Sequence, residues 1–324
     1  LRPSDVYHCS KVGFVEYIQT GITASLDQYF YPVEIGKAAK DIGFRVVLHG
    51  TFNGYTSKED LIRLYKEYNS GENSLIRYHI GLHAEYTSSP EEEKVIGEVL
   101  EELKAPFFVH ISETKKEVEE CHVRHGMSPV QYFDSLGFYK YGGAGYHCIH
   151  FSDEDIKIYK NKKVYMVTNP GSNQYLESGT CPVERYVDEG FDLAIGTDGP
   201  ASNYDLDMFA EMKIIHANNP KVSCEEIVKM ATVNGARAMM IPDCDMLVEG
   251  KLADIIMLDK DIVQNNKNIF DSIVENANKK SVKMTMIDGK VLYKEGGLIL
   301  NEKLIDLYRK VKEISARIDK EVSE

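Results

Sequence analysis

The feature that most constrains the fold is a repeated alternation of short β-rich runs with longer amphipathic stretches. Seven runs predict strands: Ile22–Asp27, Phe44–His49, Ile76–His83, Phe107–Ser112, Gly145–His150, Val164–Thr168 and Asp192–Thr197. Helix-type patterns lie between them: Val33–Asp41, Lys58–Tyr68, Pro90–Leu103, Lys115–Cys121, Asp153–Lys160 and Val183–Glu189. Such alternation favours βαβ units and a parallel sheet.

The number of strands and the opening helix indicate which parallel sheet to expect. A predicted helix, Val12–Thr20, runs straight into the first of the seven strands, so a further strand should precede it. A (β/α)8 barrel has eight strands. We therefore expect an α/β fold, a (β/α)8 TIM barrel lacking its first strand in this chain. An open doubly wound sheet is the alternative, but no glycine-rich dinucleotide fingerprint follows any predicted strand.

The pattern changes towards the C-terminus. Helical patterns at Leu206–Ile215 and Cys224–Met240 are followed by predicted strands at Leu252–Asp259, Val282–Asp288 and Lys290–Lys294, and by a charged helix at Glu302–Val322. Asp288-Gly289 predicts a tight turn between two of the strands. We therefore expect a barrel over residues 1–245, the C-terminal part of a small β-sandwich over 246–300, and a C-terminal helix over 301–324.

Charge and cysteine content exclude several classes of protein. Acidic residues outnumber basic ones by 51 to 38, which argues against a nucleic-acid or anionic-membrane partner. The six cysteines include no CxxC pair, so neither a zinc ribbon nor a redox motif is indicated. Reduced thiols in the cytoplasm fit this pattern. No run of 18 apolar residues suggests a membrane span.

Three predicted strands end in residues that a metal hydrolase needs. His110 lies in the strand before Glu113, His147 lies in the next strand, and Asp198 follows the last one. A single histidine on a strand is more often a core residue than a ligand, and a single aspartate before glycine is usually part of a turn or a helix cap. Together, at the carboxyl ends of separate strands in one barrel, they indicate an active site, because catalytic residues of such barrels occupy that end. Alternation along the last strand places Asp198 on the same face as Ala194 and Gly196.

The other histidines carry weaker signals. His147 and His150 form an HxxH pattern, but on a strand they point to opposite faces, so we expect only His147 in the site and a structural role for His150. His83, at another strand end, could contact substrate or simply pack. His122 and His125, near the end of a charged helix, are expected to be solvated.

Several segments, taken in order, resemble one family. They are His110–Thr114, Asn169–Asn173, Gly196–Asn203, Glu211-Met212, Ala231–Ala236 and Gly250–Asp254. The chain resembles the amidohydrolase superfamily, in the branch that holds chlorohydrolases and methylthioadenosine/S-adenosylhomocysteine deaminases. The resemblance covers nearly the whole chain.

The resemblance implies a role for each site residue. His110 is similar to a zinc ligand, and Asp198 to a ligand that also accepts a proton and contacts substrate. Glu113 resembles the proton shuttle that touches the substrate ring, His147 the histidine that polarises the attacking water, and His83 a substrate contact. Imidazole and carboxylate ligands would accept Zn²⁺, Fe²⁺ or Mn²⁺.

Two departures from the family bear on these expectations. The family carries HxH on its first barrel strand, and this sequence has no His-x-His. We expect that the chain is part of a longer product, with a degenerate, metal-free relative as the alternative. An acidic residue of the deaminases that holds ribose is displaced here, at Glu34 in the loop Tyr29–Glu34, which leaves nucleoside specificity open.

We therefore expect zinc-assisted hydrolytic deamination of an adenosine-type nucleoside, or of a related heterocycle. A hydrolase of the same fold with another substrate, similar to guanine deaminase or a chlorohydrolase, is one alternative, and a non-catalytic barrel used for binding is another. The expected partners are a small heterocyclic substrate and further copies of the chain in a homo-oligomer.

Overall fold

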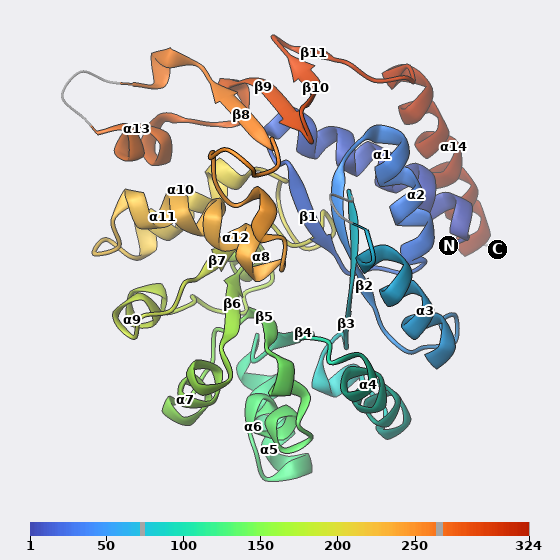
Figure 1. Cartoon of the computed structure of the whole chain (residues 1–324), viewed down its shortest axis with the longest axis vertical. Coiled ribbons are helices and arrows are strands. Elements are labelled where there is room, and N and C mark those ends of the chain that lie inside the picture. The colour runs from blue at the N-terminus through green and yellow to red at the C-terminus, as the bar shows by residue number, and fades with distance from the viewer. Residues whose placement is uncertain (72–74, 264–267, 324) are drawn as a thin grey trace.

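A computed structural model describes residues 1–71, 75–263 and 268–323, and its main feature is a curled sheet of seven parallel strands. The strands are paired in sequence order, which places β1 and β7 at the two edges. They are β1 (Ala24–Asp27), β2 (Arg45–Gly50), β3 (Ile76–Gly81), β4 (Phe107–Ile111), β5 (Gly143–His147), β6 (Val164–Thr168) and β7 (Ala194–Ile195). The predicted barrel architecture is confirmed for these seven strands (Figure 1).

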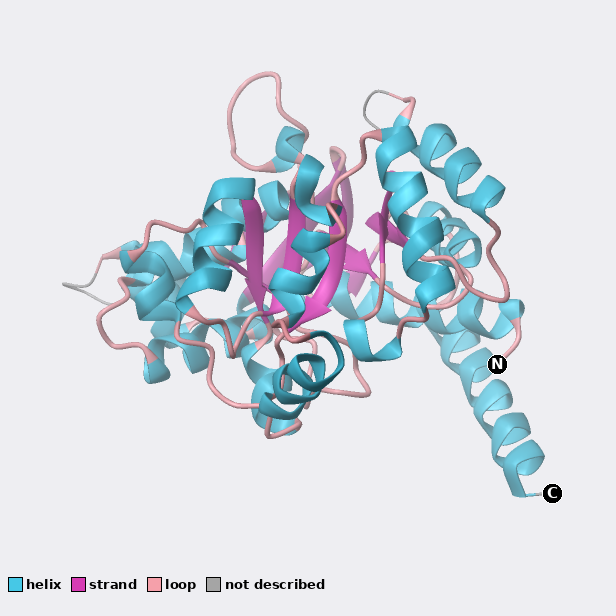
Figure 2. Ribbon diagram, turned by 90° about the horizontal axis from the view of Figure 1, so that it is seen from below, coloured by secondary structure: helices cyan, strands magenta, loops and turns pink. Residues whose placement is uncertain are grey.

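Helices surround the sheet on its outer side (Figure 2). The described helices of the chain are α1 (Pro3–Thr20), α2 (Pro32–Ile42), α3 (Lys58–Asn69), α4 (Pro90–Leu103), α5 (Lys115–His125), α6 (Pro129–Ser135), α7 (Asp153–Lys162), α8 (Pro170–Tyr175), α9 (Val183–Asp188), α10 (Met208–Asn218), α11 (Cys224–Ala231), α12 (Val233–Ala238), α13 (Ile269–Asn276) and α14 (Leu304–Ser323). Serine or threonine hydroxyls cap many of them, as Ser57 does for α3 and Ser152 for α7, because these side chains accept the free amide hydrogens of the first turn.

Several helices differ from the sequence prediction. Helix α1 begins at Pro3 rather than Val12, since proline suits the first position of a helix. The helix predicted over Cys224–Met240 is two helices, because the backbone of Thr232, at φ −128° and ψ −95°, is not helical. Helices α6, α8 and α13 were not predicted.

A second sheet, antiparallel and four-stranded, follows the barrel. It contains β8 (Ile255–Leu258), β9 (Val282–Ile287), β10 (Lys290–Lys294) and β11 (Gly297–Leu298), paired in the order β11–β10–β9–β8. The turn between β9 and β10 has positive φ at both Asp288 and Gly289, so the predicted tight turn is confirmed. The proposed domain bounds at residues 246 and 301 remain predictions.

A buried ion pair joins the two sheets. The Arg45 guanidinium in β2 donates from Nε and Nη2 to the two carboxylate oxygens of Asp254, at 2.6 and 2.9 Å. Both side chains are 2% exposed. Asp254 also accepts a hydrogen bond from the amide of Asp288, at 2.9 Å. Removing one partner of such a buried pair leaves an uncompensated charge, so this contact fixes the small sheet against β2.

Two histidines, His49 and His79, lie inside the barrel, and each contacts a main-chain carbonyl of a residue far away in the sequence. Nε2 of His49 is 3.3 Å from the Phe108 oxygen, and Nε2 of His79 is 2.9 Å from the Met239 oxygen. The ring of His79 also stacks on Phe108, with centroids 4.5 Å apart. The sequence alone indicated no partner for either histidine. Burial lowers the pKa of each imidazole to about 4.

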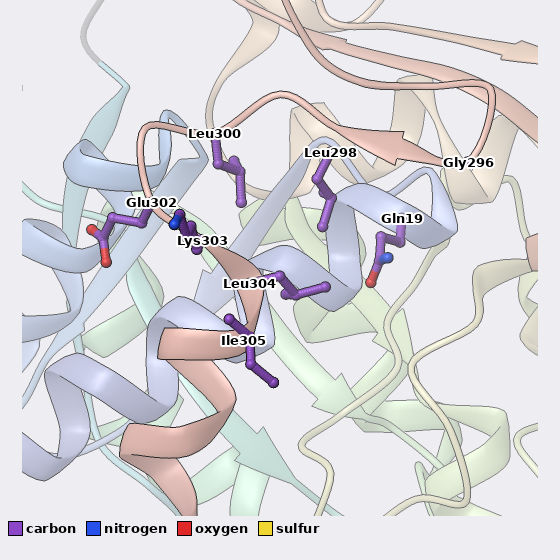
Figure 3. Close-up of a pocket in the computed structure, with 8 residues that line it drawn as sticks. All are labelled: Gln19, Gly296, Leu298, Leu300, Glu302, Lys303, Leu304 and Ile305. Atoms are coloured by element: carbon purple, nitrogen blue, oxygen red, sulfur yellow. The ribbon is translucent and has the colours of Figure 1, made fainter.

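An open pocket of about 460 Å³ lies away from the strand ends that hold the candidate residues. Its lining comes from the end of α1, from β11 and from the start of α14 (Figure 3). Leu298, Leu300, Leu304 and Ile305 are the apolar side chains among its lining residues. No helix in the described part of the chain is long and apolar enough to cross a membrane.

The buried His79 predicts a specific dependence of stability on pH. Its pKa is about 4 in the folded protein against 6.5 ordinarily, so the unfolded state binds a proton that the folded state excludes. The free energy of unfolding should fall as the pH is lowered through this interval, by about 1.4 kcal/mol per pH unit from this residue alone. His79→Gln retains an N–H donor for the Met239 carbonyl and cannot titrate. Denaturant unfolding at several pH values should show that it reduces the slope.

The control for loss of a histidine is His122→Gln, on the exposed side of α5. An unchanged slope in His79→Gln would show that His79 does not contribute to the acid sensitivity of the fold.

Candidate active site

The predicted site residues converge at the carboxyl ends of β3, β4, β5 and β7. The ring centroids of His83 and His110 are 4.9 Å apart, and those of His110 and His147 are 5.5 Å apart. Nε2 of His147 lies 3.8 Å from a carboxylate oxygen of Glu113 and 3.9 Å from one of Asp198. The structure therefore brings all five residues together at one end of the barrel.

The backbone turns sharply where these side chains leave the strands. Ser112, His147 and Asp198 have φ of 49°, 69° and 56°, in the left-handed region that residues with a Cβ rarely adopt. Each such position costs about 1–3 kcal/mol unless neighbouring contacts hold it, and such positions cluster at functional sites. Strand β7 ends at Ile195. The alternation argument that placed Asp198 is therefore wrong, and a strained turn directs its side chain instead.

His110 presents one ring nitrogen to the site. Its Nδ1 is 3.0 Å from the His83 carbonyl oxygen and donates to it, which leaves the lone pair of Nε2 available. Burial and, secondarily, the adjacent His147 lower the pKa of His110 to about 3. The imidazole is thus neutral at pH 7, the form that binds metals.

The orientation of His147 is fixed from the segment that follows β6. Its Nδ1 donates to the side-chain oxygen of Asn173 at 2.8 Å, and its Nε2 lies 3.4 Å from the amide nitrogen of Asn169. The ring is 1% exposed. Its Nε2 therefore faces Glu113 and Asp198.

Both carboxylates of the site also have fixed partners. Asp198 accepts hydrogen bonds from Ser172 Oγ at 2.6 Å and from its neighbour Gly199 N at 2.7 Å. Burial acts to raise the pKa of Asp198, but the Ser172 hydrogen bond and the nearby His147 outweigh it and hold the pKa below its ordinary value. Glu113 accepts from Ser178 Oγ at 2.8 Å. Asp198 is therefore ionised near neutral pH.

The segment 169–173 is the part of the site to which the sequence had assigned no role. Asn169 and Asn173 contact His147, and Ser172 contacts Asp198. We call these five residues, Asn169 to Asn173, the hub. The signal that found the other residues was present here too, because the hub places polar side chains directly after the end of β6.

Other predictions have mixed outcomes. The ring of His83 is exposed beside His110, with Nδ1 2.9 Å from Thr87 Oγ1, so it is open to the mouth of the barrel. His150 contacts the Ser178 carbonyl through Nε2 at 2.9 Å, as a structural residue would. His125 is not solvated as predicted, because it contacts Glu85 at 2.8 Å and stacks on a tyrosine ring.

Glu34 lies in the first turn of α2, and its carboxylate pairs with Lys37 at 2.6 Å. Its possible role towards ribose remains a prediction.

A second cluster has the donor types of a metal site. Among the described residues, Glu85, Cys121 and His125 are the only three whose ligand atoms lie within 4.8 Å of one another. However, the Arg124 guanidinium donates hydrogen bonds from Nε and Nη2 to the two oxygens of the Glu85 carboxylate. Burial also raises the pKa of Cys121 to about 12, which keeps the thiol protonated. This cluster is therefore an ion-pair network, and the donors at the barrel mouth are better suited to a metal.

Comparisons with characterised proteins agree with this geometry. The chain is 37% identical over 309 residues to "5-methylthioadenosine/S-adenosylhomocysteine deaminase" of Thermoanaerobacter pseudethanolicus, covering 90% of this chain and 72% of the relative. It is 34% identical to "5'-deoxyadenosine deaminase" of Methanothermobacter thermautotrophicus, covering 92% and 74%.

Solved structures agree as well. An adenosine deaminase from Xanthomonas campestris with bound zinc superposes with a TM-score of 0.90 at 25% identity, over 99% of this chain and 76% of that one. An atrazine chlorohydrolase from Arthrobacter aurescens shares the fold, with a TM-score of 0.84 at 17% identity over 97% and 77%. Residues 1–292 match the Amidohydrolase family, and the chain therefore belongs to that family.

Proposed function

We propose that this protein is a metal-dependent aminohydrolase that deaminates an adenosine-type nucleoside related to methylthioadenosine or S-adenosylhomocysteine. The observation that carries the proposal is the convergence of His110, Glu113, His147 and Asp198 at one end of the barrel, with their partners fixed. The names of the similar deaminases support the substrate class.

The residues present fit a divalent metal. His110 would bind through Nε2, since its Nδ1 already donates to a carbonyl, and Asp198 would supply a carboxylate oxygen. Hydrogen bonds that fix metal ligands in this way are typical of metal sites. A bound metal would act as a Lewis acid and lower the pKa of a coordinated water towards about 7. Zinc is the proposed ion, as in the similar adenosine deaminase, although imidazole and carboxylate also accept Fe²⁺ or Mn²⁺.

The side chains divide the proton transfers among them. Asp198, which is ionised, takes a proton from the attacking water, and His147 accepts a hydrogen bond from the same water through Nε2. Water adds to the ring carbon that carries the amino group. Glu113, in its protonated form, gives its proton to the adjacent ring nitrogen. It then takes the proton of the new hydroxyl group and delivers it to the amino group, so that the C–N bond breaks, C=O forms and ammonia leaves. Return of the proton held by Asp198 to Glu113 restores both carboxyl groups. The exposed ring of His83 lies where it can contact the heterocycle.

A cytoplasmic location is also proposed, because all six cysteines, which lie in the described part of the chain, are free thiols. A homo-oligomer remains a prediction.

A substrate panel tests the proposed activity. Adenosine, methylthioadenosine, S-adenosylhomocysteine and 5′-deoxyadenosine should each release ammonia with the spectral shift from an adenine to a hypoxanthine ring. Guanine and a chlorotriazine should react slowly or not at all. Turnover of the chlorotriazine or of guanine alone would contradict the nucleoside assignment and favour the corresponding alternative. No turnover of any compound would contradict catalysis and favour a binding role.

Asp198→Asn tests the proton acceptor. The amide keeps the size of the side chain but cannot take the proton, so kcat should fall by about 10²–10⁴-fold. Asp153→Asn is the matched control, because its carboxylate is 84% exposed and pairs with Arg185 on the outer surface. Steady-state kinetics on the best substrate of the panel would measure both. A loss in Asp198→Asn no larger than in the control would remove Asp198 from the mechanism.

A further inference from the structure

We propose that Glu211 of α10 is a positioning residue that holds both the hub and the strained turn before Asp198 in their active arrangement. The inference rests on the proposed function, because its consequence is the placement of the proton acceptor. Glu211 is 2% exposed and does not belong to the group of side chains that meet at the barrel mouth.

The Glu211 carboxylate links the ends of two neighbouring strands. One oxygen, Oε2, accepts the backbone N–H of Gly171 at 2.6 Å, in the hub after β6. The other, Oε1, accepts from Asn203 Nδ2 at 2.7 Å, and the same Nδ2 donates to the Thr197 carbonyl at 2.5 Å. One side chain thus restrains the segment after β6 and the segment after β7.

The contact requires a close approach of the backbone. A Cβ added at Gly171 would lie 2.4 Å from Glu211 Oε1 and 2.6 Å from Asn203 Oδ1. Since no side chain fits there, glycine is what lets the hub backbone reach the carboxylate.

Both restraints lead directly to Asp198. Gly171 precedes Ser172, whose hydroxyl donates to Asp198, and Thr197 precedes Asp198 itself. Asp198 has a left-handed backbone, with φ of 56°, which persists only where surrounding contacts define it. Glu211 therefore restrains Asp198 in two ways. It holds Ser172, which donates to the Asp198 carboxylate, and it holds the backbone of Thr197, which directly precedes Asp198.

The arrangement requires a group that accepts hydrogen bonds at both ends. The two oxygens of Glu211 accept from Gly171 and from Asn203 at the same time, whereas a glutamine would turn an N–H₂ group towards one of these two donors. Burial raises the pKa of Glu211 to about 7, and the charges of Asp207 and Asp198 act in the same direction, while the bonds from Asn203 and Gly171 oppose them. Glu211→Gln keeps the size of the side chain and replaces one of the two acceptor oxygens by an N–H₂ group, so it tests whether both acceptors are needed.

Hydrogen–deuterium exchange tests the positioning without any substrate. In Glu211→Gln, the amides of Asn169 and of residues 171–175 should exchange faster, and so should the amide of Gly199, which donates to Asp198. Loosening of α8 alone would not change the exchange of Gly199. Faster exchange at residues 169–175 without a change at Gly199 would therefore overturn the inference, and so would unchanged exchange at both places. Glu225→Gln, in an exposed pair with Lys229 on α11, is the matched control.

Kinetics then test the route through Ser172. Glu211→Gln should lower kcat by about 10–100-fold, the range typical of residues that orient a catalytic group. If it acts through the Ser172–Asp198 bond, the double variant with Ser172→Ala should lose little more than the more damaging single variant. A loss equal to the product of the two single losses would overturn the inference.

A third variant covers the case in which Glu211→Gln does not fold. Gly171→Ala keeps Glu211 but places a Cβ against its Oε1, so it should separate the hub from the carboxylate. We expect the same exchange changes at Gly199 and a kcat loss of the same order. Unchanged exchange and kcat in Gly171→Ala would overturn the inference. If the wild-type protein deaminates no compound of the panel, the proposed function fails, while the exchange measurements still decide the role of Glu211.

Discussion

The site depends on the hydrogen bonds from the hub to His147 and Asp198. These two side chains leave their strands at backbone positions with φ of 69° and 56°, which an isolated chain would avoid. Asn173 fixes the ring of His147 at 2.8 Å, and Ser172 fixes the carboxylate of Asp198 at 2.6 Å. Without these contacts, neither group would have a defined direction relative to Glu113.

The barrel supplies the frame on which the hub acts. Parallel pairing in sequence order brings the ends of β4, β5, β6 and β7 together, so that residues far apart in sequence meet within a few ångströms. The buried pair between Arg45 and Asp254 joins the small sheet to β2. In the order of the sheet, β2 is separated from β6, which leads into the hub, by β3, β4 and β5. The strand order of the barrel thus brings the groups together, and local hydrogen bonds set their final orientation.

Sequence patterns predicted the parts of this structure that depend on local chemistry. All seven barrel strands were located, because each is a short apolar run between helical patterns, and His110, His147, Asp198 and Glu113 were found because each lies at a strand end. The carbonyl partners of His49 and His79, the ion pair of His125 and the contact of Glu211 with the hub were not found. Their partners come from other elements, and no local pattern encodes such pairs. The left-handed turn at Asp198 was missed for a similar reason, since tertiary contacts maintain it.

Anomalous diffraction from crystals of the protein grown with zinc tests most directly whether the barrel mouth binds the proposed metal. We expect an anomalous peak at the zinc edge within ligand distance, roughly 2.0–2.2 Å, of His110 Nε2 and of a carboxylate oxygen of Asp198. A peak at Glu85, Cys121 and His125, with none at the barrel mouth, would contradict this expectation.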